Sequence, residues 1–214
     1  NWLAMEGRPP FKKKYSSVKA IANYNLGSVW LASFDEKLQT MESLKGKRIA
    51  IGRGTQILWA IEPMWIIDKQ LGMKDDIDIQ YVGTKPAMTA LLDGIVDAAI
   101  VGGYINPEGK IVASPQTMEL IAAGKKLYNI SWGKEAIQGV IDKGYPVAPI
   151  TVPANAIEGL DTPIDSFCDP IAWVGYPELS EETAYKVTKM IIDNVTKFID
   201  YHALGQLMTP KSLD

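Results

Sequence analysis

The chain has 214 residues, 47% of them hydrophobic, and its 22 basic and 25 acidic residues leave a net charge of −3. A chain of this size can bury one substantial core or two modest ones. The nearly balanced charge excludes the strong basic field that attracts nucleic acid or anionic membranes. One cysteine and one histidine exclude an intrachain disulfide and a Cys/His zinc cluster.

No apolar run reaches the ~20 residues that a membrane-spanning helix needs. The sequence begins at Asn1, with neither a methionine nor a signal peptide. We therefore expect a processed chain or a fragment.

The first segment, residues 1–17, is polar and is expected to be an exposed connection. Residues 18–23 and 29–34 then resemble two strands, because small and β-branched apolar residues dominate both. The polar stretch 24–28 between them is expected to form a bend, either lining a cleft or serving as an ordinary turn.

A glycine-rich motif follows, and it is the most informative stretch of the sequence. Residues 49–51 are short, branched and apolar, as a buried parallel strand should be. Gly52 and Gly54 allow the backbone to come close to a ligand, and Thr55 is a good N-cap for a helix that begins at Gln56. A helix that starts after such a strand directs unpaired N–H groups and a partial positive charge towards an anion.

Three interpretations of this motif can be compared. It lacks the Gly-Lys-Ser/Thr ending of a phosphate-binding P-loop, and position 57, where a dinucleotide fingerprint needs a third glycine, is Ile57. The remaining alternatives are a βα turn that is glycine-rich only for packing and a loop that binds a carboxylate. The sequence leaves both open.

Three further strands and four helices are predicted after the motif. Strands are predicted at 77–82, 96–101 and 127–132, and helices at 56–71, 84–95, 116–123 and 134–143. Their alternation predicts a parallel sheet with helices on its faces. In such sheets ligands bind beyond the carboxyl ends of the strands, and residues 52–56, 83–85 and 102–106 are expected at that edge.

After Pro146 the pattern changes to short extended runs separated by prolines, notably 150–152 and 171–174. Ser180 is then expected to cap a long amphipathic helix that reaches about Tyr201. Its apolar stripe is typical of a core-facing helix, and consists of Ala184, Val187, Ile191, Val195 and Phe198.

Taken together, these patterns predict an α/β protein of two lobes. Residues 1–43 and 146–214 would form a discontinuous first lobe, and residues 44–145 would be inserted as the second. Two crossings between the lobes, near 35–43 and 145–150, describe a hinge that can close on a ligand.

The motif at 44–55 resembles the start of the second lobe in type II periplasmic solute-binding proteins. Within them the chain most resembles the TAXI family of TRAP-transporter solute receptors. Three further stretches support this resemblance by their order and spacing: 91–103, 151–154 and 179–182. It extends from about Pro10 to the C-terminus.

The chain also departs from this family. Its members usually carry a longer glycine-proline-serine loop where this chain has only Gly52 to Thr55, and the loop 105–115 looks longer than usual. Arg53 adds a cation beside the loop, where it could pair with a ligand carboxylate or face solvent. The family's receptors have a longer N-terminal part, so the first lobe is expected to be incomplete here.

The resemblance implies a binding protein and not an enzyme: an extracytoplasmic, periplasmic receptor. It would close on a small carboxylate or amino-acid-like solute and deliver it to the membrane permease of a TRAP transporter, without a cofactor. Gly54, Thr55 and Gln56 would donate to the carboxylate, and Arg53 would be its counter-charge. The remaining expected contacts are Tyr24, Asn25, Gly103, Tyr104 and Asn106.

Two other functions use the same scaffold. An enzyme such as a dehydratase or a pyrimidine-precursor synthase would need a nucleophile–base pair or a metal cluster, and the sequence offers only Cys168, beside Asp169, and His202. A regulator's sensor domain would need a DNA-binding or signalling module outside this sequence.

Overall fold

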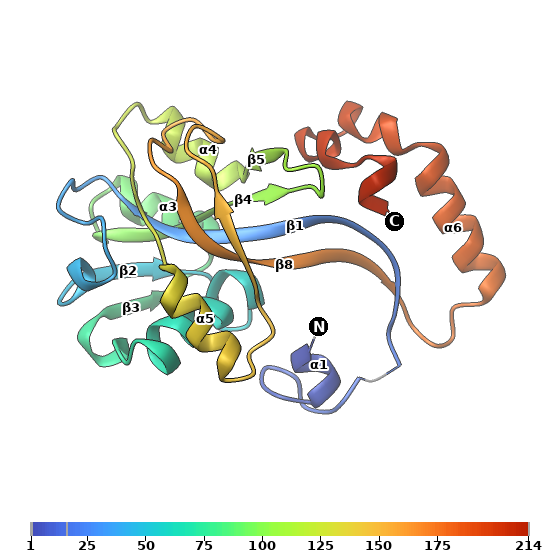
Figure 1. Cartoon of the computed structure of the whole chain (residues 1–214), viewed down its shortest axis with the longest axis horizontal. Coiled ribbons are helices and arrows are strands. Elements are labelled where there is room, and N and C mark those ends of the chain that lie inside the picture. The colour runs from blue at the N-terminus through green and yellow to red at the C-terminus, as the bar shows by residue number, and fades with distance from the viewer. Residues whose placement is uncertain (1, 16, 214) are drawn as a thin grey trace. The chain divides into compact units, whose positions relative to one another are not determined.

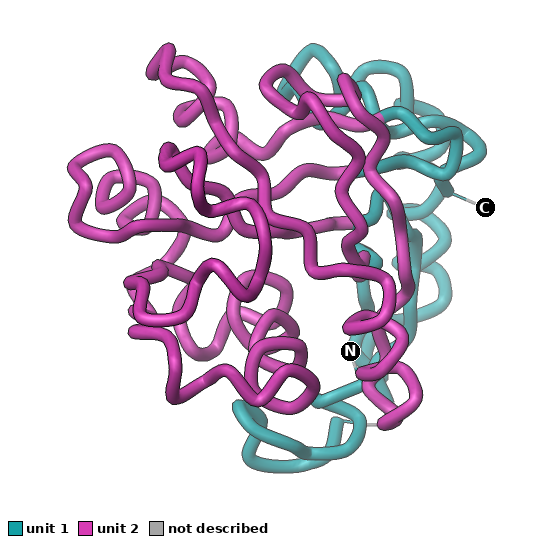
Figure 2. The backbone as a smooth tube through the Cα atoms, turned by 60° about the vertical axis from the view of Figure 1, so that its left-hand side comes forward, with its two compact units in different colours: residues 1–26, 105–110, 170–214 teal, residues 27–104, 111–169 magenta. Residues whose placement is uncertain are grey.

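A computed structural model describes residues 2–15 and 17–213 (Figure 1). The Cα positions divide the chain into two compact units, coloured separately in Figure 2. Unit 1 comprises residues Asn1–Leu26, Ile105–Lys110 and Pro170–Asp214, and unit 2 comprises Gly27–Tyr104 and Ile111–Asp169. These borders differ from the expected ones at 43 and 145, and the hinge between two lobes stays a prediction.

The described elements follow one another in mixed α/β order, as predicted from the sequence. They are α1 (Trp2–Glu6), β1 (Lys19–Ser33), η1 (Glu42–Leu44), β2 (Arg48–Ile51), η2 (Ile57–Ile61), α2 (Glu62–Met64), η3 (Trp65–Gln70), η4 (Lys74–Asp76), β3 (Asp78–Tyr81), α3 (Thr84–Leu92), β4 (Ala98–Ile105), β5 (Ile111–Ala113), α4 (Pro115–Ala122), β6 (Tyr128–Ile130), α5 (Lys134–Asp142), β7 (Ala148–Val152), β8 (Ile164–Gly175), α6 (Glu181–Asp193), η5 (Val195–Asp200), η6 (Ala203–Leu207) and η7 (Pro210–Leu213).

The strands form one sheet in the order β3-β2-β4-β1-β8-β7, with β5 added beside β4 and β6 beside β1. β2 runs parallel to both of its neighbours, and Ile49 pairs with Ile79 on one side and Ala98 on the other. β6 is antiparallel to β1, and β7 is antiparallel to β8. The predicted parallel sheet is therefore confirmed for β2, β3 and β4 and is wrong for β6.

β1 is one continuous strand, so the predicted bend at 24–28 is wrong. Polar residues that are typical of a turn are buried in this strand instead: Asn25 and Ser28 are each 1% exposed. The Ser28 hydroxyl donates to the Ser166 hydroxyl of β8 at 3.0 Å. Pairing with neighbouring strands thus outweighs local turn propensity here.

The predicted helix 56–71 forms as one helical run, residues 57–70, which ends before Gly72 at φ 66°. Wide π-helical turns flank a short α-helical turn that contains Pro63. Because proline has no N–H, it cannot donate to the carbonyl of Trp59, four residues before it. That carbonyl instead accepts a hydrogen bond from the amide of Gly52, at 2.9 Å.

β4 continues through Gly102, Gly103 and Tyr104, where the sequence analysis expects a strand end. The backbone of Gly102 is fully engaged: its amide donates to the Thr117 hydroxyl at 2.9 Å, and its carbonyl accepts from that hydroxyl at 2.7 Å. The short strand β5 pairs with β4 and extends the ladder. Hydrogen bonding by α4 and β5 therefore keeps this glycine pair extended.

The core of unit 2 contains strands that are buried on both faces, including Ile49–Ile51 of β2 and Ala98–Val101 of β4. In α3, Met88 and Leu91 are buried, whereas Ile95, the last residue of the predicted helix, lies beyond α3 and is 54% exposed.

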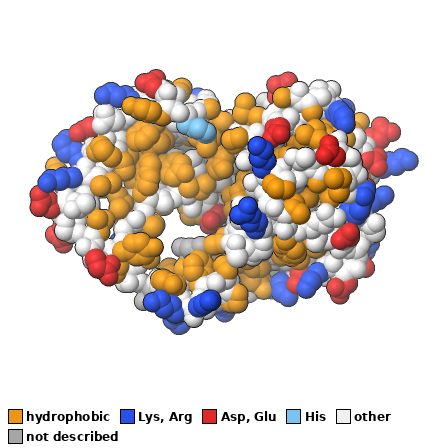
Figure 3. Space-filling model, turned by 180° about the vertical axis from the view of Figure 1, so that it is seen from behind, with side chains coloured by type: hydrophobic (Ala, Val, Ile, Leu, Met, Phe, Trp, Pro, Cys, Tyr) orange, Lys and Arg blue, Asp and Glu red, His pale blue; other side chains and the backbone are white. Residues whose placement is uncertain are grey.

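Unit 1 has a small core of its own, built on α6. The predicted cap is confirmed, because the Ser180 hydroxyl accepts from the amide of Thr183. Ile191 and Val195 of the predicted stripe are buried with Met208, and Phe198 packs against them. The helix ends at Asp193, and a 3₁₀ segment continues to Asp200. Figure 3 shows hydrophobic side chains (orange) around the pale-blue histidine.

Candidate functional site

The loop after β2, residues 52–56, is the candidate site (the β2 loop). Gly52 is buried under the start of the following helix, and a Cβ placed on it would lie 2.7 Å from the Trp59 Cβ. Glycine is therefore required there for close packing. Gly54 is exposed, and a Cβ there would meet only Tyr81, at an ordinary 3.8 Å. Gly52 is thus needed for close packing, whereas the space around Gly54 would accept a side chain.

Gln56, and not Thr55, occupies the cap position of the helical run, so the predicted Thr55 cap is wrong. The Gln56 side-chain oxygen accepts from the amide of Arg53 at 2.7 Å, and the Gln56 amide donates to the Arg53 carbonyl at 2.8 Å. These two bonds close the β2 loop on itself. They leave Thr55 at its exposed tip.

Several donors of the β2 loop have no hydrogen-bond partner among the described residues. Within residues 2–15 and 17–213, neither the amides of Gly54, Thr55 and Ile57 nor the Thr55 hydroxyl take part in a hydrogen bond. N–H groups at a helix start carry a partial positive charge and are ready partners for an anion. The geometry fits a carboxylate or another small oxyanion.

Arg53 brings a full positive charge to the same place. Its side chain is exposed and lies along Gly83, whose hypothetical Cβ would be 3.3 Å from the Arg53 Nε. Gly83 has φ 97° and is the N-cap of α3, which carries Lys85 in its first turn. Arg53 therefore brings residues 52–56 into contact with residues 83–85. These are two of the three strand ends that the sequence predicts at one edge of the sheet.

Tyr24 and Asn25 belong to unit 1 and have different surroundings. The Tyr24 ring packs on Trp173 with 4.8 Å between ring centroids, and burial raises the pKa of its hydroxyl. Asn25 is buried, and within the described residues neither atom of its side-chain amide has a hydrogen-bond partner. A buried amide without partners is costly, so Asn25 is well suited to receive a polar ligand group.

The other predicted residues have internal roles. Gly103 of β4 faces the β5 strand, where a Cβ would lie 2.9 Å from the Val112 carbonyl oxygen, and Tyr104 follows it in the same strand. In unit 1 the Asn106 side-chain oxygen accepts from the amides of Glu108 and Lys110, which organises the turn 106–110.

A buried acidic group in unit 2 is absent from the sequence-based site. Glu62 is 3% exposed, and its Oε2 atom has no hydrogen-bond partner among the described residues. Burial, with a smaller effect from Asp169, raises the pKa of Glu62 to about 8. A lone charged residue inside the apolar stretch 57–67 was the available sequence signal.

Cys168 lies near the same acidic groups. Burial, reinforced by Asp169 and Glu62, raises the pKa of its thiol to about 11. The thiol is therefore protonated near neutral pH, which is the unreactive form.

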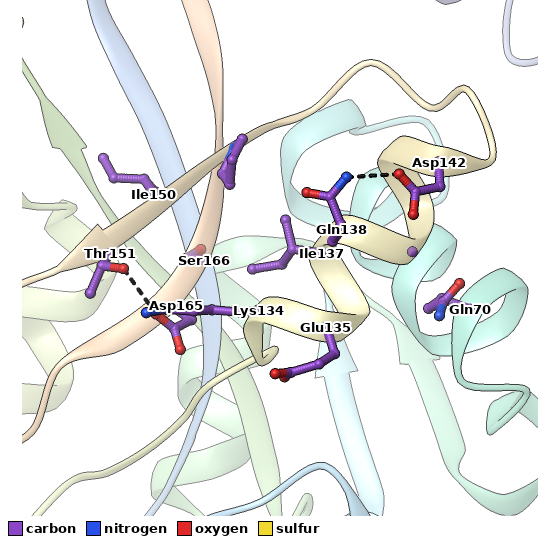
Figure 4. Close-up of a pocket in the computed structure, with 12 residues that line it drawn as sticks. Gln70, Lys134, Glu135, Ile137, Gln138, Asp142, Ile150, Thr151, Asp165 and Ser166 are labelled. Atoms are coloured by element: carbon purple, nitrogen blue, oxygen red, sulfur yellow. Dashed lines mark hydrogen bonds and ion pairs between the residues drawn. The ribbon is translucent and has the colours of Figure 1, made fainter.

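Unit 2 also has a cavity of about 720 Å³ between α5 and the strands β7 and β8 (Figure 4). Its polar lining includes Lys134, Asp142, Thr151 and Asp165, and Gln70 reaches it from the end of the helical run. The sequence gives no signal for this cavity, because its walls come from α5, β7 and β8, which pack together only in the fold.

Searches for a metal site and for a membrane helix were limited to the described residues. Among them, no group of three or more His, Cys, Asp or Glu side chains is arranged to hold a metal ion. None of the helices among them combines the length and the apolarity that crossing a membrane requires.

The fold matches solved structures of periplasmic binding proteins. A structure described as a periplasmic transporter aligns with a TM-score of 0.50 and 14% identity, over 98% of this chain and 65% of the other. A mutant of ArgBP from T. maritima gives a TM-score of 0.45 and 13% identity over 89% and 61%. A putative L-cystine ABC transporter from Listeria monocytogenes gives 0.45 and 12% over 93% and 66%.

The chain thus spans 61% to 66% of the length of these three structures. At such low identity the likeness shows the fold alone, the type II periplasmic-binding-protein fold. No curated protein matches the sequence. The model of the NMT1-like family matches residues 2–214. The chain belongs to the NMT1-like family.

Proposed function

We propose that this chain is part of an extracytoplasmic solute receptor that binds a small carboxylate-bearing, amino-acid-like solute and delivers it to a TRAP-type permease. One observation carries the binding step. The β2 loop has unpaired amides at Gly54 and Thr55, directly after the cationic Arg53 in the chain and at the start of a helical run.

These groups attract a carboxylate through separate contributions. Each favourable charge at a helix N-terminus contributes about 0.3–1 kcal/mol when exposed to solvent. A guanidinium–carboxylate pair adds two parallel N–H···O bonds when its geometry is bidentate. The Thr55 hydroxyl supplies one more donor, and together these groups distinguish an anion from a neutral sugar.

The transport role is supported by the fold and by the resemblance of the sequence motifs to TAXI receptors. The names of two similar structures mention arginine binding and L-cystine transport, which fits an amino-acid-like ligand. The type of permease rests on the motif resemblance. Tyr24, Asn25 and Asn106 stay predicted contributors, and of these Asn25 has the unpartnered amide that a ligand would satisfy.

The test is thermal unfolding in the presence of mono- and dicarboxylates, amino acids and neutral sugars, each over a range of concentrations. A ligand that binds the folded state raises the unfolding midpoint as its concentration exceeds the dissociation constant. We expect carboxylates to shift the midpoint and neutral sugars not to.

Matched variants locate the site. Arg53→Ala and Thr55→Val should reduce the carboxylate shift, whereas Lys126→Ala and Thr162→Val, at exposed positions of the same unit, should leave it unchanged. A shift that survives both β2-loop substitutions would place the carboxylate elsewhere. A well-folded chain that no carboxylate stabilises would contradict the proposed function.

A further inference from the structure

The cavity beside α5 is independent of the β2 loop and has the size of a small-molecule site. Its volume of about 720 Å³ lies within the usual range for such sites. It is lined on one side by α5 and on the other by β7 and the start of β8 (Figure 4). All of its lining residues belong to unit 2.

The lining carries more negative than positive charge. Glu135, Asp142 and Asp165 supply three carboxylates, against one ammonium group from Lys134. Lys134 does not neutralise its neighbour well: its Nζ is 4.0 Å from the Asp165 Oδ1, and its side chain is 74% exposed. Such an excess of carboxylates favours a cationic ligand.

Two of the carboxylates are held in place at opposite ends of the cavity. Asp165 accepts a hydrogen bond from the Thr151 hydroxyl at 2.9 Å, close to the first residue of α5. Asp142, the last residue of α5, accepts from the Gln138 side chain at 2.7 Å. A helix rises 1.5 Å per residue, so the two ends of α5 are about 12 Å apart.

Between these ends the surface is apolar. Ile137 of α5 and Pro149 of β7 contribute apolar side chains to the lining, and Ile137 points from α5 towards β7 (Figure 4). A chain of methylene groups could lie along these side chains and would be shielded from water there. The pattern is therefore a negative end, an apolar middle and a second negative end.

Gln70 adds an unsatisfied acceptor to this lining. Its Oε1 atom is buried and has no hydrogen-bond partner among the described residues. The side chain packs where Gly139 of α5 has no Cβ. A buried carbonyl oxygen without a donor is unfavourable, and an N–H group of a ligand would satisfy it.

We propose that this cavity binds a linear aliphatic polyamine, with its terminal ammonium groups at Asp165 and Asp142 and its methylene chain along Ile137 and Pro149. An extended spermidine is comparable in length to α5, which is about 12 Å from end to end. The site is separate from the β2 loop and does not depend on the function proposed for it.

Isothermal titration calorimetry with spermidine tests the proposal on the whole chain, and butylamine, with one ammonium group, is the comparison ligand. We expect saturable binding of spermidine and weaker binding of butylamine. Asp142→Asn should weaken spermidine binding about fivefold, the effect of one partly exposed ion pair. Lys134→Met should strengthen it, because the competing cation is removed.

Asp161→Asn and Lys126→Met are matched controls, since these residues form an exposed ion pair of 3.5 Å outside the cavity. Neither should change the affinity. Absence of saturable binding, or an equal loss in Asp142→Asn and Asp161→Asn, would overturn the proposal. Loss of spermidine binding in Arg53→Ala would also overturn it, because the amine would then occupy the β2-loop site. Unchanged thermal unfolding of each variant confirms that it folds.

Discussion

The Glu62 side chain is buried, and its Oε2 atom has no hydrogen-bond partner among the described residues. Its pKa is raised from 4.5 to about 8, chiefly by burial. The unfolded chain therefore releases this proton at lower pH than the folded chain. Stability contributed by the protonated form is present below the unfolded pKa and is lost as the pH rises towards 8.

We predict that the free energy of unfolding falls by about 3–5 kcal/mol between pH 4.5 and 8.5 because of this group. Urea denaturation across this range measures the change. Glu62→Gln keeps the shape and removes the charge, so it should abolish most of the fall, whereas Glu158→Gln, at an exposed position, should not. Parallel pH curves for Glu62→Gln and the unmodified chain would contradict the prediction.

Gly52 and Gly54 of the β2 loop differ in the space available for a side chain. Gly52→Ala should cost about 1–3 kcal/mol of stability, because its Cβ would overlap Trp59. Gly54→Ala should be nearly neutral, since its Cβ would reach only ordinary contact with Tyr81. Thermal unfolding of the two variants measures these losses of stability. Equal losses in both variants would show that close packing against Trp59 does not require glycine at position 52.

At the scale of the elements, Pro63 connects the helical run to the β2 loop. Because it lacks an N–H, the Trp59 carbonyl is free to accept from the amide of Gly52. The proline that seems to interrupt the helix thereby fixes the first residue of the candidate site. The sequence shows Pro63 as a kink or a helix start, but it does not show where the released carbonyl bonds.

We predict that Pro63→Ala speeds hydrogen exchange at the Gly52 amide about tenfold, because the new N–H competes for the Trp59 carbonyl. Pro86→Ala is the control: Pro86 lies in the first turn of α3, where an N–H has no helical partner. Exchange at Gly52 that does not respond to Pro63→Ala would show that this bond does not hold the β2 loop.

The network around Gly102 allows a second test of an element. Thr117→Val would leave the buried amide and carbonyl of Gly102 without their side-chain partner, so we predict a loss of about 1–3 kcal/mol. Thr183→Val, in the exposed first turn of α6, should cost less than about 0.5 kcal/mol. Chemical denaturation compares the two, and a small loss at Thr117 would argue against the network.

Elements with strong local signals could be predicted from the sequence. The buried strand at Ile49, the Ser180 cap and the glycine after the helical run all act over a few residues, and each is found in the structure. β1 and β4 could not be predicted in full, because Asn25 and Gly103 look like turn residues until neighbouring strands pair with them. The sequence predicts residues 52–56 as a candidate binding loop. It does not predict that the Gln56 side chain accepts a hydrogen bond from the amide of Arg53.

At the scale of the whole molecule, the candidate ligand contacts are distributed over both compact units. Arg53 and Thr55 belong to unit 2, whereas Tyr24 and Asn25 belong to unit 1. The change of pattern after Pro146 suggests two lobes, and their bounds stay a prediction; the compact units divide within β1 and near the middle of β8. Long strands that pass from one unit to the other give no local signal where the border lies.

The two side chains that the sequence offers to an enzyme, Cys168 and His202, lie in different compact units. Cys168 is buried with a thiol pKa raised to about 11, and His202, in unit 1, accepts from the amide of Leu204 through its Nδ1. The protonated thiol is not the nucleophilic form. The receptor hypothesis rests on the unpaired donors of the β2 loop.

Its central claim is that backbone amides of the β2 loop bind a carboxylate. Nitrogen–proton correlation spectra of the isotope-labelled chain, titrated with the carboxylate that most raises the unfolding midpoint, test this directly. We predict saturable shifts at the amides of Gly54, Thr55 and Ile57, with the amide of Gly52 little changed because it already bonds to Trp59. Shifts confined to other residues, with these amides unmoved, would contradict the account.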